Sequence, residues 1–196
     1  MTLSAIVTVP AVLAPADFTA PIAGEPALVR AVRAVRGVGP VTVVATGDLA
    51  AAATECLAAH GLSDVPVLAE AAVPGENGAV LVHDVRYPLA PAELAERVAA
   101  ALPDHDVVIP VLAMTDSVKS VTAEYIVLGN VDRSELVTAQ YPRAYTAAVL
   151  ADFAPEDLAA LTSAGLNVGI VDGDPDAFAV DLARDRELLD AIVSAG

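Results

Sequence analysis

The sequence predicts an α/β fold: a mainly parallel, Rossmann-like sheet flanked by helices, with a protruding β-arm. Short apolar runs of strand length alternate with helix-length segments as far as residue 119. Such alternation builds parallel sheets that are covered by helices on both faces. The alternation stops at about residues 120–140, where two strand-like runs follow one another and predict the arm.

Each element follows from a local pattern. Apolar, β-rich runs predict strands at 3–10, 41–45, 65–68, 80–89, 106–112 and 168–171. Capping, proline and glycine signals predict helices at 26–36, 49–60, 92–102, 142–150, 155–164 and 184–194. In the arm, Gly129-Asn130 is expected to join the runs 121–128 and 131–138 as a hairpin. A length of 196 residues suits one domain, spanning 1–196.

Composition limits the classes of partner. A net charge of −16 repels nucleic acid and anionic membranes, so neither is expected to bind. No basic N-terminal segment precedes a long apolar run, and Cys56 is the only cysteine, which together predict a cytoplasmic protein with an inert core thiol. The core is built from small side chains, so subunit association is expected to supply part of the stability.

The first candidate site lies where the run at 80–89 ends in an acid, a base and a proline. Ligands of open α/β sheets bind at the carboxyl ends of strands. Asp84 can reach a cation or a ribose hydroxyl, and Arg86 can fork onto a phosphate. The alternative is that both are solvated residues of an ordinary strand-to-helix turn.

Three further features each have a functional and a structural interpretation. Lys119, the only lysine, follows Asp116-Ser117 and is either a catalytic cation or a surface residue. Arg30, Arg33 and Arg36 share one side of a helix, which favours a solvated face over a phosphate site. The acidic turn at 172–176 lacks the spacing of a calcium loop, so a solvated turn is favoured there.

The turn after the first strand lacks the chemistry of a phosphate-binding loop. Such loops are rich in glycine, so that backbone N–H groups can close on phosphate oxygens. Residues 11–18 contain no glycine, lysine or arginine, and they include Asp17. We therefore expect that this turn does not cradle a triphosphate.

Four stretches in register resemble the methylerythritol phosphate cytidylyltransferases, which have a nucleotide-sugar-type transferase fold. Residues 80–88 resemble the family's His-Asp-Ala-Ala-Arg-Pro strand end, and 109–119 resemble a proline-containing strand that leads to Asp-Thr-x-Lys. Residues 131–145 resemble Val-Asp-Arg-x-x-Leu followed by Gln-Thr-Pro-Gln-Ala-Phe. Residues 171–180 resemble Gly-Asp followed by Asn-Phe-Lys-Ile-Thr.

The resemblance implies an arm-exchanged homodimer, a Mg²⁺ ion, and attack of a sugar phosphate on the α-phosphate of CTP. Asp84 would lie on the nucleotide and metal side, and Arg86, whose own chemistry suits a phosphate, is the substrate-binding candidate beside it. Arg133 on the arm would contact the sugar phosphate in the partner subunit's site, as a catalytic and substrate-binding residue. Lys119 would be a second catalytic cation.

Several positions depart from the family pattern. Ala16 and Ala179 stand where the family has lysines, and Tyr141 stands in place of a threonine. Tyr87 replaces the arginine before the proline, and Arg86 lies one residue early, so its side chain should point differently. Each lost charge-assisted donor costs ~10²–10³ in rate.

Three functions therefore remain open. The first is a cytidylyltransferase-like homodimer whose CTP transfer is lost or strongly weakened. The second is an active nucleotidyltransferase with altered substrates, which uses Asp84, Arg86, Lys119 and Arg133 around a metal-bound nucleotide. The third is a non-catalytic interaction or regulatory homodimer, for example one that pairs with a genuine pathway enzyme.

Overall fold

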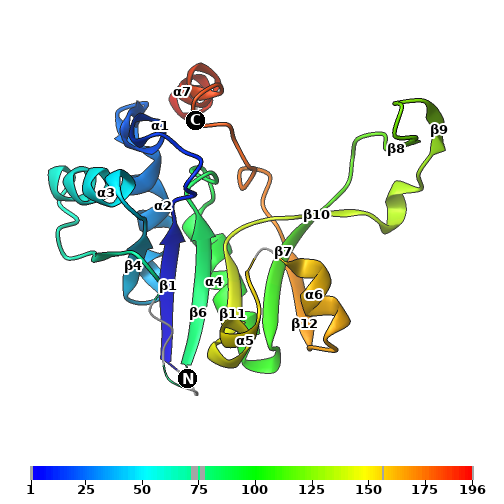
Figure 1. The fold of residues 1–196 in the computed structure, drawn as a ribbon, viewed down its shortest axis with the longest axis horizontal. Helices are drawn as coiled ribbons and strands as arrows, with labels where there is room; N and C mark the ends of the chain where they lie inside the picture. Colours follow the sequence, from blue (N-terminus) through cyan, green and yellow to red (C-terminus); the bar gives the residue numbers. More distant parts are fainter. Residues whose placement is uncertain (1, 72–74, 76–77, 156, 196) are drawn as a thin grey trace.

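The computed structural model describes residues 2–71, 75, 78–155 and 157–195. One group of parallel strands consists of β5 (Val67–Leu68), β4 (Val41–Val44), β1 (Thr2–Thr8) and β6 (Gly78–Asp84), in that spatial order. A second parallel pair consists of β7 (Val107–Ala113) and β12 (Val168–Asp172). The mainly parallel sheet predicted from the sequence is confirmed (Figure 1).

An antiparallel strand, β11 (Arg143–Thr146), joins the two parallel groups by pairing with β6 on one side and β7 on the other. The prediction of a helix over 142–150 is therefore wrong in its first half, and only α5 (Ala147–Asp152) is helical. Without β11, both β6 and β7 would leave an unpaired edge inside the sheet. This gain in backbone pairing outweighs the weak local preference of an alanine-containing run for helix.

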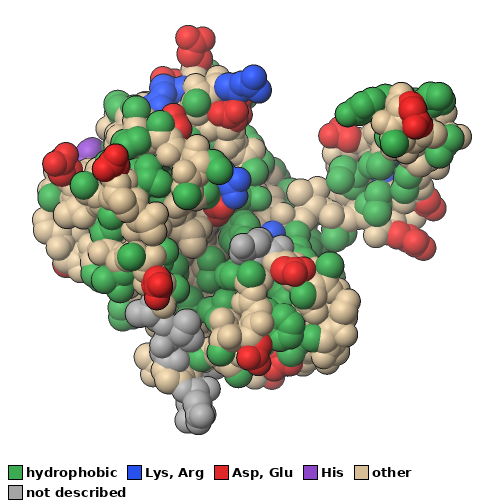
Figure 2. Space-filling model, in the orientation of Figure 1, with side chains coloured by type: hydrophobic (Ala, Val, Ile, Leu, Met, Phe, Trp, Pro, Cys, Tyr) green, Lys and Arg blue, Asp and Glu red, His purple; other side chains and the backbone are tan. Residues whose placement is uncertain are grey.

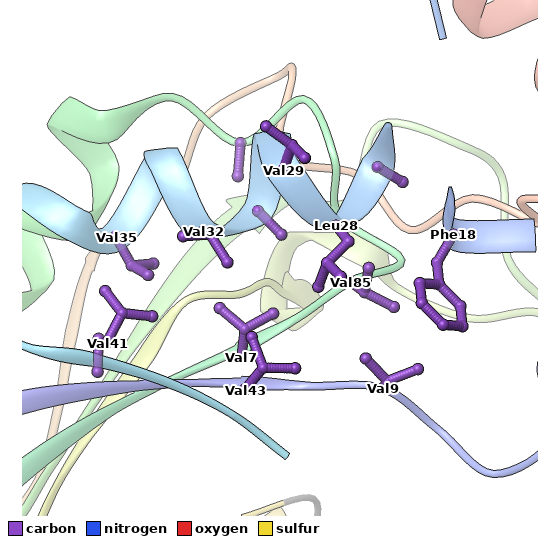
Figure 3. Close-up of a cluster of buried hydrophobic side chains, with 14 of the residues drawn as sticks. Val7, Val9, Phe18, Leu28, Val29, Val32, Val35, Val41, Val43 and Val85 are labelled. Carbon is purple, nitrogen blue, oxygen red and sulfur yellow. The ribbon is translucent and has the colours of Figure 1, made fainter. Parts of the chain in front are cut away.

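Helices cover both faces of the sheet. On one face, α2 (Ala27–Val35), α3 (Asp48–Ala59) and α4 (Ala92–Ala101) pack on the larger hydrophobic cluster. Figure 3 shows α2 placing Leu28, Val32 and Val35 over strand residues that include Val7 and Val43. On the other face, α5 and α6 (Leu158–Ser163) pack on a smaller cluster. Residues of β1 alternate between the two clusters, as expected for a strand buried on both sides.

The arm projects from the carboxyl end of β7 (Figure 1). It contains a two-stranded hairpin, β8 (Lys119–Val121) with β9 (Val127–Asn130). The hairpin turn lies at 122–126, where the Thr122 hydroxyl accepts hydrogen bonds from two backbone N–H groups, so the predicted turn at Gly129-Asn130 is wrong. The chain then returns through η3 (Arg133–Glu135) and β10 (Val137–Ala139), which pairs with β7.

The remaining elements are short, apart from the C-terminal helix. They are α1 (Pro15–Thr19), the short pair β2 (Pro21–Ile22) and β3 (Glu25–Pro26), η1 (Arg36–Val38), η2 (Leu102–Asp104) and α7 (Arg186–Ala195). The Cys56 thiol is buried, as predicted, and burial raises its pKa, which makes it a poor nucleophile.

Candidate functional site

The site is built where parallel strands end. β6 is buried along its whole length and finishes at Asp84, next to Thr8 at the end of β1. The chain leaves the sheet after Asp84, because Pro88 and Pro91 cannot continue it and the helix α4 begins at Ala92. The predicted strand over 80–89 therefore ends at Asp84. Its functional side chains face the sheet edge at which open α/β folds bind ligands.

Asp84 and Arg86 bind one another. The backbone N–H and the Nε–H of Arg86 donate to Asp84 Oδ1 at 2.9 and 3.0 Å. Nη2 donates to Oδ2 at 2.6 Å, and Nε also lies 3.2 Å from Oδ2. This pairing raises the pKa of the Arg86 guanidinium. The structure thus brings the two predicted residues together, and it uses both carboxylate oxygens of Asp84 in doing so.

A second arginine, Arg143 on β11, lies in the same cluster. Its Nε donates to the Gln140 carbonyl at 2.9 Å, and its Nη1 donates to the Pro155 carbonyl at 3.3 Å. Its guanidinium carbon stands 4.0 Å from the ring centroid of Tyr141, a cation–π contact. Arg143 is buried, and no carboxylate of the described residues forms an ion pair with it.

Arg143 is not among the site residues predicted from the sequence, because a helix was expected at 142–150. The available signal was an arginine inside an otherwise apolar and aromatic run, at 141–145. Gln140 is also absent from the predicted site residues, and its amide bonds both ways with the backbone of Asp174, at 2.7 and 2.9 Å. That amide ties the start of β11 to the loop after β12.

Two tyrosines separate two cavities at this edge. The rings of Tyr87 and Tyr141 lie 5.2 Å apart between centroids and are tilted by 59°. Burial raises the pKa of the Tyr87 phenol, and the positive charge of Arg143 partly opposes that rise. The Tyr87 phenol is therefore a neutral wall of the site at physiological pH.

The first cavity, of about 320 Å³, contains the Asp84–Arg86 pair. Its other lining residues are Thr8, Pro10, Val82, Tyr141 and Pro155. The second, of about 350 Å³, lies at the end of β7 and extends to the loop after β12. Its lining is mostly apolar or neutral, and Asp116 is the one charged residue among the described residues of that lining. We call these the β6 cavity and the β7 cavity.

The turn between β1 and α1 supports the prediction that it does not cradle a triphosphate. The backbone N–H of Ala14 donates to the Asp17 carboxylate at 2.7 Å in the capping of α1, so this N–H is not free for a phosphate. From the C-terminal helix, Arg186 donates to the carbonyls of Ala16 and Asp17 at 3.1 and 3.4 Å. These contacts hold the turn with groups of the chain itself.

The other predicted cations lie on the arm. Lys119 bonds to the Asn130 side chain within the hairpin, and Arg133 bonds to the Thr115 carbonyl at the base of the arm. Within this subunit, neither lies among the residues that line the β6 cavity. A role for Lys119 or Arg133 in the site of a partner subunit stays a prediction.

The two remaining sequence features have structural roles. In the arginine stripe, Arg33 pairs with Glu25, and Arg36 pairs with Asp64. The acidic turn accepts hydrogen bonds from Arg97 through the carbonyls of Asp172 and Gly173. The ion pairs favour a structural role for the arginine stripe rather than a phosphate site. The contacts of Arg97 favour a structural role for the acidic turn rather than a calcium site.

The Mg²⁺ ion implied by the family resemblance finds a poor set of protein ligands. Among the described residues, no three histidine, cysteine, aspartate or glutamate side chains come together as a metal site. Asp84 is the single carboxylate among the described residues that line the β6 cavity, and Arg86 binds both of its oxygens. Magnesium usually keeps several waters and takes one or two carboxylates from the protein, so it needs a free carboxylate oxygen, and Arg86 occupies both oxygens of Asp84. The residues present therefore do not fit a protein-held divalent cation at Asp84.

Comparison with known proteins decides the family. The sequence profile of 2-C-methyl-D-erythritol 4-phosphate cytidylyltransferase matches residues 17–195. The chain belongs to this family. The cytidylyltransferase of Frankia casuarinae is 35% identical over 192 residues, which cover 88% of this chain and 72% of the relative. The cytidylyltransferase of Rhodococcus jostii is 36% identical over 138 residues, which cover 66% of this chain and 61% of the relative. That match therefore spans less than two thirds of the relative's length.

Solved structures of the family share the fold. The 4-diphosphocytidyl-2C-methyl-D-erythritol synthase of Anaerococcus prevotii has a TM-score of 0.76 at 19% identity, with 98% of both chains covered. The cytidylyltransferase of Thermus thermophilus has a TM-score of 0.73 at 22% identity, with 99% of this chain and 100% of that chain covered. The predicted relationship to the cytidylyltransferases is confirmed.

None of the helices in the described part of the chain combines the length and the apolar character needed to cross a bilayer.

Proposed function

We propose that this cytidylyltransferase-family chain binds a phosphorylated small ligand at the carboxyl edge of its sheet but transfers cytidylyl groups far more slowly than its named relatives. The proposal retains the family's sheet and site position. It departs from the activity that the relatives' name states in one respect, the rate at which CTP would react with 2-C-methyl-D-erythritol 4-phosphate.

The scarcity of positive charge at the site is the observation that supports slow transfer. Among the described residues that line the two cavities or form the turn at 9–14, Arg86 is the only lysine or arginine, and Asp84 engages its backbone N–H, Nε and Nη2, which leaves Nη1 for a ligand. Nucleotidyl transfer depends on positioning and on neutralising the phosphates, with little covalent work for the protein. Since each missing donor costs ~10²–10³ in rate, several missing donors leave little turnover.

Pyrophosphate release tests the proposal directly. The chain is incubated with CTP, Mg²⁺ and 2-C-methyl-D-erythritol 4-phosphate, beside the Thermus thermophilus enzyme in the same assay. We expect kcat/KM at least ~10³-fold below that enzyme, because more than one donor is missing. A value within about tenfold of it contradicts the proposal.

A gain-of-function variant tests the reason for the slow rate. Ala16 and Ala179 are exposed at the turn and at the β7 cavity, so lysines there would add cations without entering the core. The double substitution Ala16→Lys with Ala179→Lys is expected to raise turnover by about tenfold or more. Ala159→Lys, on the exposed side of α6, is the matched control and should leave turnover unchanged.

A second function is favoured by the lining of the β7 cavity. With Asp116 as its one charged residue, this cavity suits an uncharged acceptor better than a phosphate. The second candidate is therefore an active transferase with an altered acceptor. Pyrophosphate release with unphosphorylated 2-C-methyl-D-erythritol, and not with its phosphate, would support this candidate over the first.

The arm provides a surface for a second copy of the chain, so we propose a homodimer that exchanges arms. A two-stranded hairpin is marginally stable alone, and this one exposes large apolar side chains, including those of Tyr125, Ile126, Val127 and Leu128. Figure 2 shows hydrophobic side chains gathered on the arm. An exchanged arm would place Arg133 and Lys119 beside the partner's site.

A further inference from the structure

The feature that carries a further inference is the direct contact between Asp84 and Arg86 in the β6 cavity. Three donor groups of Arg86, namely the backbone N–H, Nε–H and Nη2–H, all point at one carboxylate, at 2.6 to 3.2 Å. A planar guanidinium that forks onto both carboxylate oxygens is a strong and geometrically specific pair. It occupies the oxygens that a metal ion would need.

The two side chains of this pair differ in their exposure to solvent. The Asp84 side chain is 7% exposed, whereas the Arg86 side chain is 44% exposed. The acid therefore lies behind the guanidinium, and the arginine is the charged group that a ligand entering the β6 cavity meets. Nη1 of Arg86 makes no hydrogen bond to any described residue, so it is a donor that remains for a ligand.

The local charge balance also favours an anion. Among the described residues, Asp84 and Arg86 contribute one negative and one positive charge to the cavity lining, and the buried Arg143 adds a second positive charge behind Tyr141 and Pro155, in a chain of net charge −16. The donors of Arg143 go to two carbonyls and its face goes to the Tyr141 ring, so no acid cancels its charge among the described residues. In a half-enclosed site of low dielectric, this excess positive charge attracts an anion more strongly than it would in water.

We infer that the β6 cavity binds a phosphate group directly on Arg86, with no bridging divalent cation, and that Asp84 is the positioning residue that holds the guanidinium in place. Arg86 thus takes the place of a metal ion as the counter-charge of Asp84. The inference rests on the proposed ligand position at this sheet edge. It concerns binding and not turnover, so either can fail without the other.

Inorganic phosphate is a suitable probe, and isothermal titration calorimetry measures its binding to the full chain. We expect the same affinity, within about twofold, in EDTA and in millimolar Mg²⁺. Arg86→Gln should weaken phosphate binding by about tenfold or more, because a charge-assisted hydrogen bond is lost. Binding that requires Mg²⁺, or no measurable binding to the unsubstituted chain, overturns the inference.

Arg36 provides a matched control. It forms an ion pair with Asp64 at the same 2.6 Å as the Arg86–Asp84 pair, and its side chain has nearly the same exposure, 45%. Arg36→Gln removes the same charge from the chain, far along the sequence from the β6 cavity, and should leave phosphate binding unchanged. If Arg36→Gln weakens binding as much as Arg86→Gln does, the effect is one of net charge and the inference fails.

The variant Asp84→Asn separates a positioning role from metal binding by the size of its effect. Loss of the carboxylate loosens the guanidinium but also removes a negative charge beside the anion, and these two effects oppose each other. Phosphate should therefore still bind, with an affinity within about tenfold of the unsubstituted chain. In a metal-bridged site the same substitution would abolish binding. Loss of measurable phosphate binding by Asp84→Asn, with the fold intact by circular dichroism, therefore contradicts the inference.

Uptake of Mn²⁺, followed by electron paramagnetic resonance, provides a second readout. The unsubstituted chain and Arg36→Gln should show the same background, and Arg86→Gln should gain a site because its Asp84 carboxylate is released. Adding Asp84→Asn to Arg86→Gln should remove that gain. If Arg86→Gln does not fold, Arg86→Lys replaces it, because lysine keeps the positive charge but lacks the two parallel donors of the guanidinium. Its phosphate affinity should then lie below that of the unsubstituted chain but remain measurable. A Mn²⁺ site in the unsubstituted chain that Asp84→Asn removes overturns the inference.

Discussion

At the scale of single residues, His83 is one of the few buried side chains in the described part of the chain whose polar atoms lack a hydrogen-bond partner. Its ring is fully buried in β6 beside Asp84, and neither nitrogen has a hydrogen-bond partner of good geometry among the described residues. Burial lowers its pKa to about 4, and the negative charge of Asp84 only partly opposes this. The folded protein therefore holds His83 neutral, whereas the unfolded chain protonates it near its usual pKa of about 6.5.

His83 makes stability depend on pH. Because the unfolded state binds more protons between pH 6.5 and pH 4, stability falls as pH is lowered through this range, by ~3 kcal/mol from this group. His83→Leu removes the titration, so its free energy of unfolding should fall less steeply over the same range. Urea denaturation at a series of pH values measures the slope. His60→Gln, at the end of α3, is the control and should keep the slope of the unsubstituted chain.

The Asp84–Arg86 contact joins residues that are only two positions apart, so it is a local contact. The turn that follows Asp84 brings the backbone N–H of Arg86 back to the Asp84 carboxylate. The sequence analysis expected the shifted arginine to point differently. It did not anticipate that the arginine would bind the neighbouring acid.

At the scale of elements, the junction between η1 and β4 depends on a close approach of two backbone segments. An added Cβ on Gly39 would lie 2.3 Å from the carbonyl oxygen of Leu3 in β1. The next residue, Pro40, accepts a hydrogen bond from Ala5 at 2.8 Å, which fixes this approach at the start of the β1–β4 pairing.

Gly39→Ala should therefore destabilise the protein, by about 1–3 kcal/mol, because a backbone atom must move to admit the methyl group. Gly37→Ala, two residues earlier, would meet only Glu96 Oε1 at an ordinary 3.7 Å. That control should be neutral or slightly stabilising. Chemical denaturation compares the two variants, and equal destabilisation by both would show that the contact with Leu3 is unimportant.

The element predicted least well was β11. Its sequence, Arg143–Thr146, continues into alanines that favour helix, and proline precedes it, so local signals point to a helix start. Its strand conformation depends on β6 and β7, whose residues lie 36 or more positions away in the chain. Pairing at that separation is not encoded in a local pattern.

At the scale of the whole molecule, the arm tests the proposed dimer. The unsubstituted chain should sediment as a dimer at micromolar concentration. Ile126 and Leu128 are 63% and 68% exposed, and changing both to aspartate should yield a folded monomer, because like charges would oppose burial of the arm. Analytical ultracentrifugation gives the mass, and circular dichroism checks the fold.

The control for this experiment is another exposed leucine away from the arm. Leu188 on α7 is 56% exposed, so Leu188→Asp makes the same chemical change on a different surface. It should leave the dimer intact. A monomeric unsubstituted chain, or a dimer that survives both substitutions on the arm, would contradict arm exchange.

The sequence by itself determined the fold class, the positions of most strands and helices, the family, and the absence of cations from the turn at 11–18. These follow from periodicity, composition and short motifs, which depend on residues close together in the chain. The tertiary structure decided that 143–146 is a strand and that Arg143 and Tyr141 stand beside Asp84 and Arg86. Such contacts join segments that are distant in sequence, and their free energy comes from sheet pairing, burial and charge proximity in the folded chain.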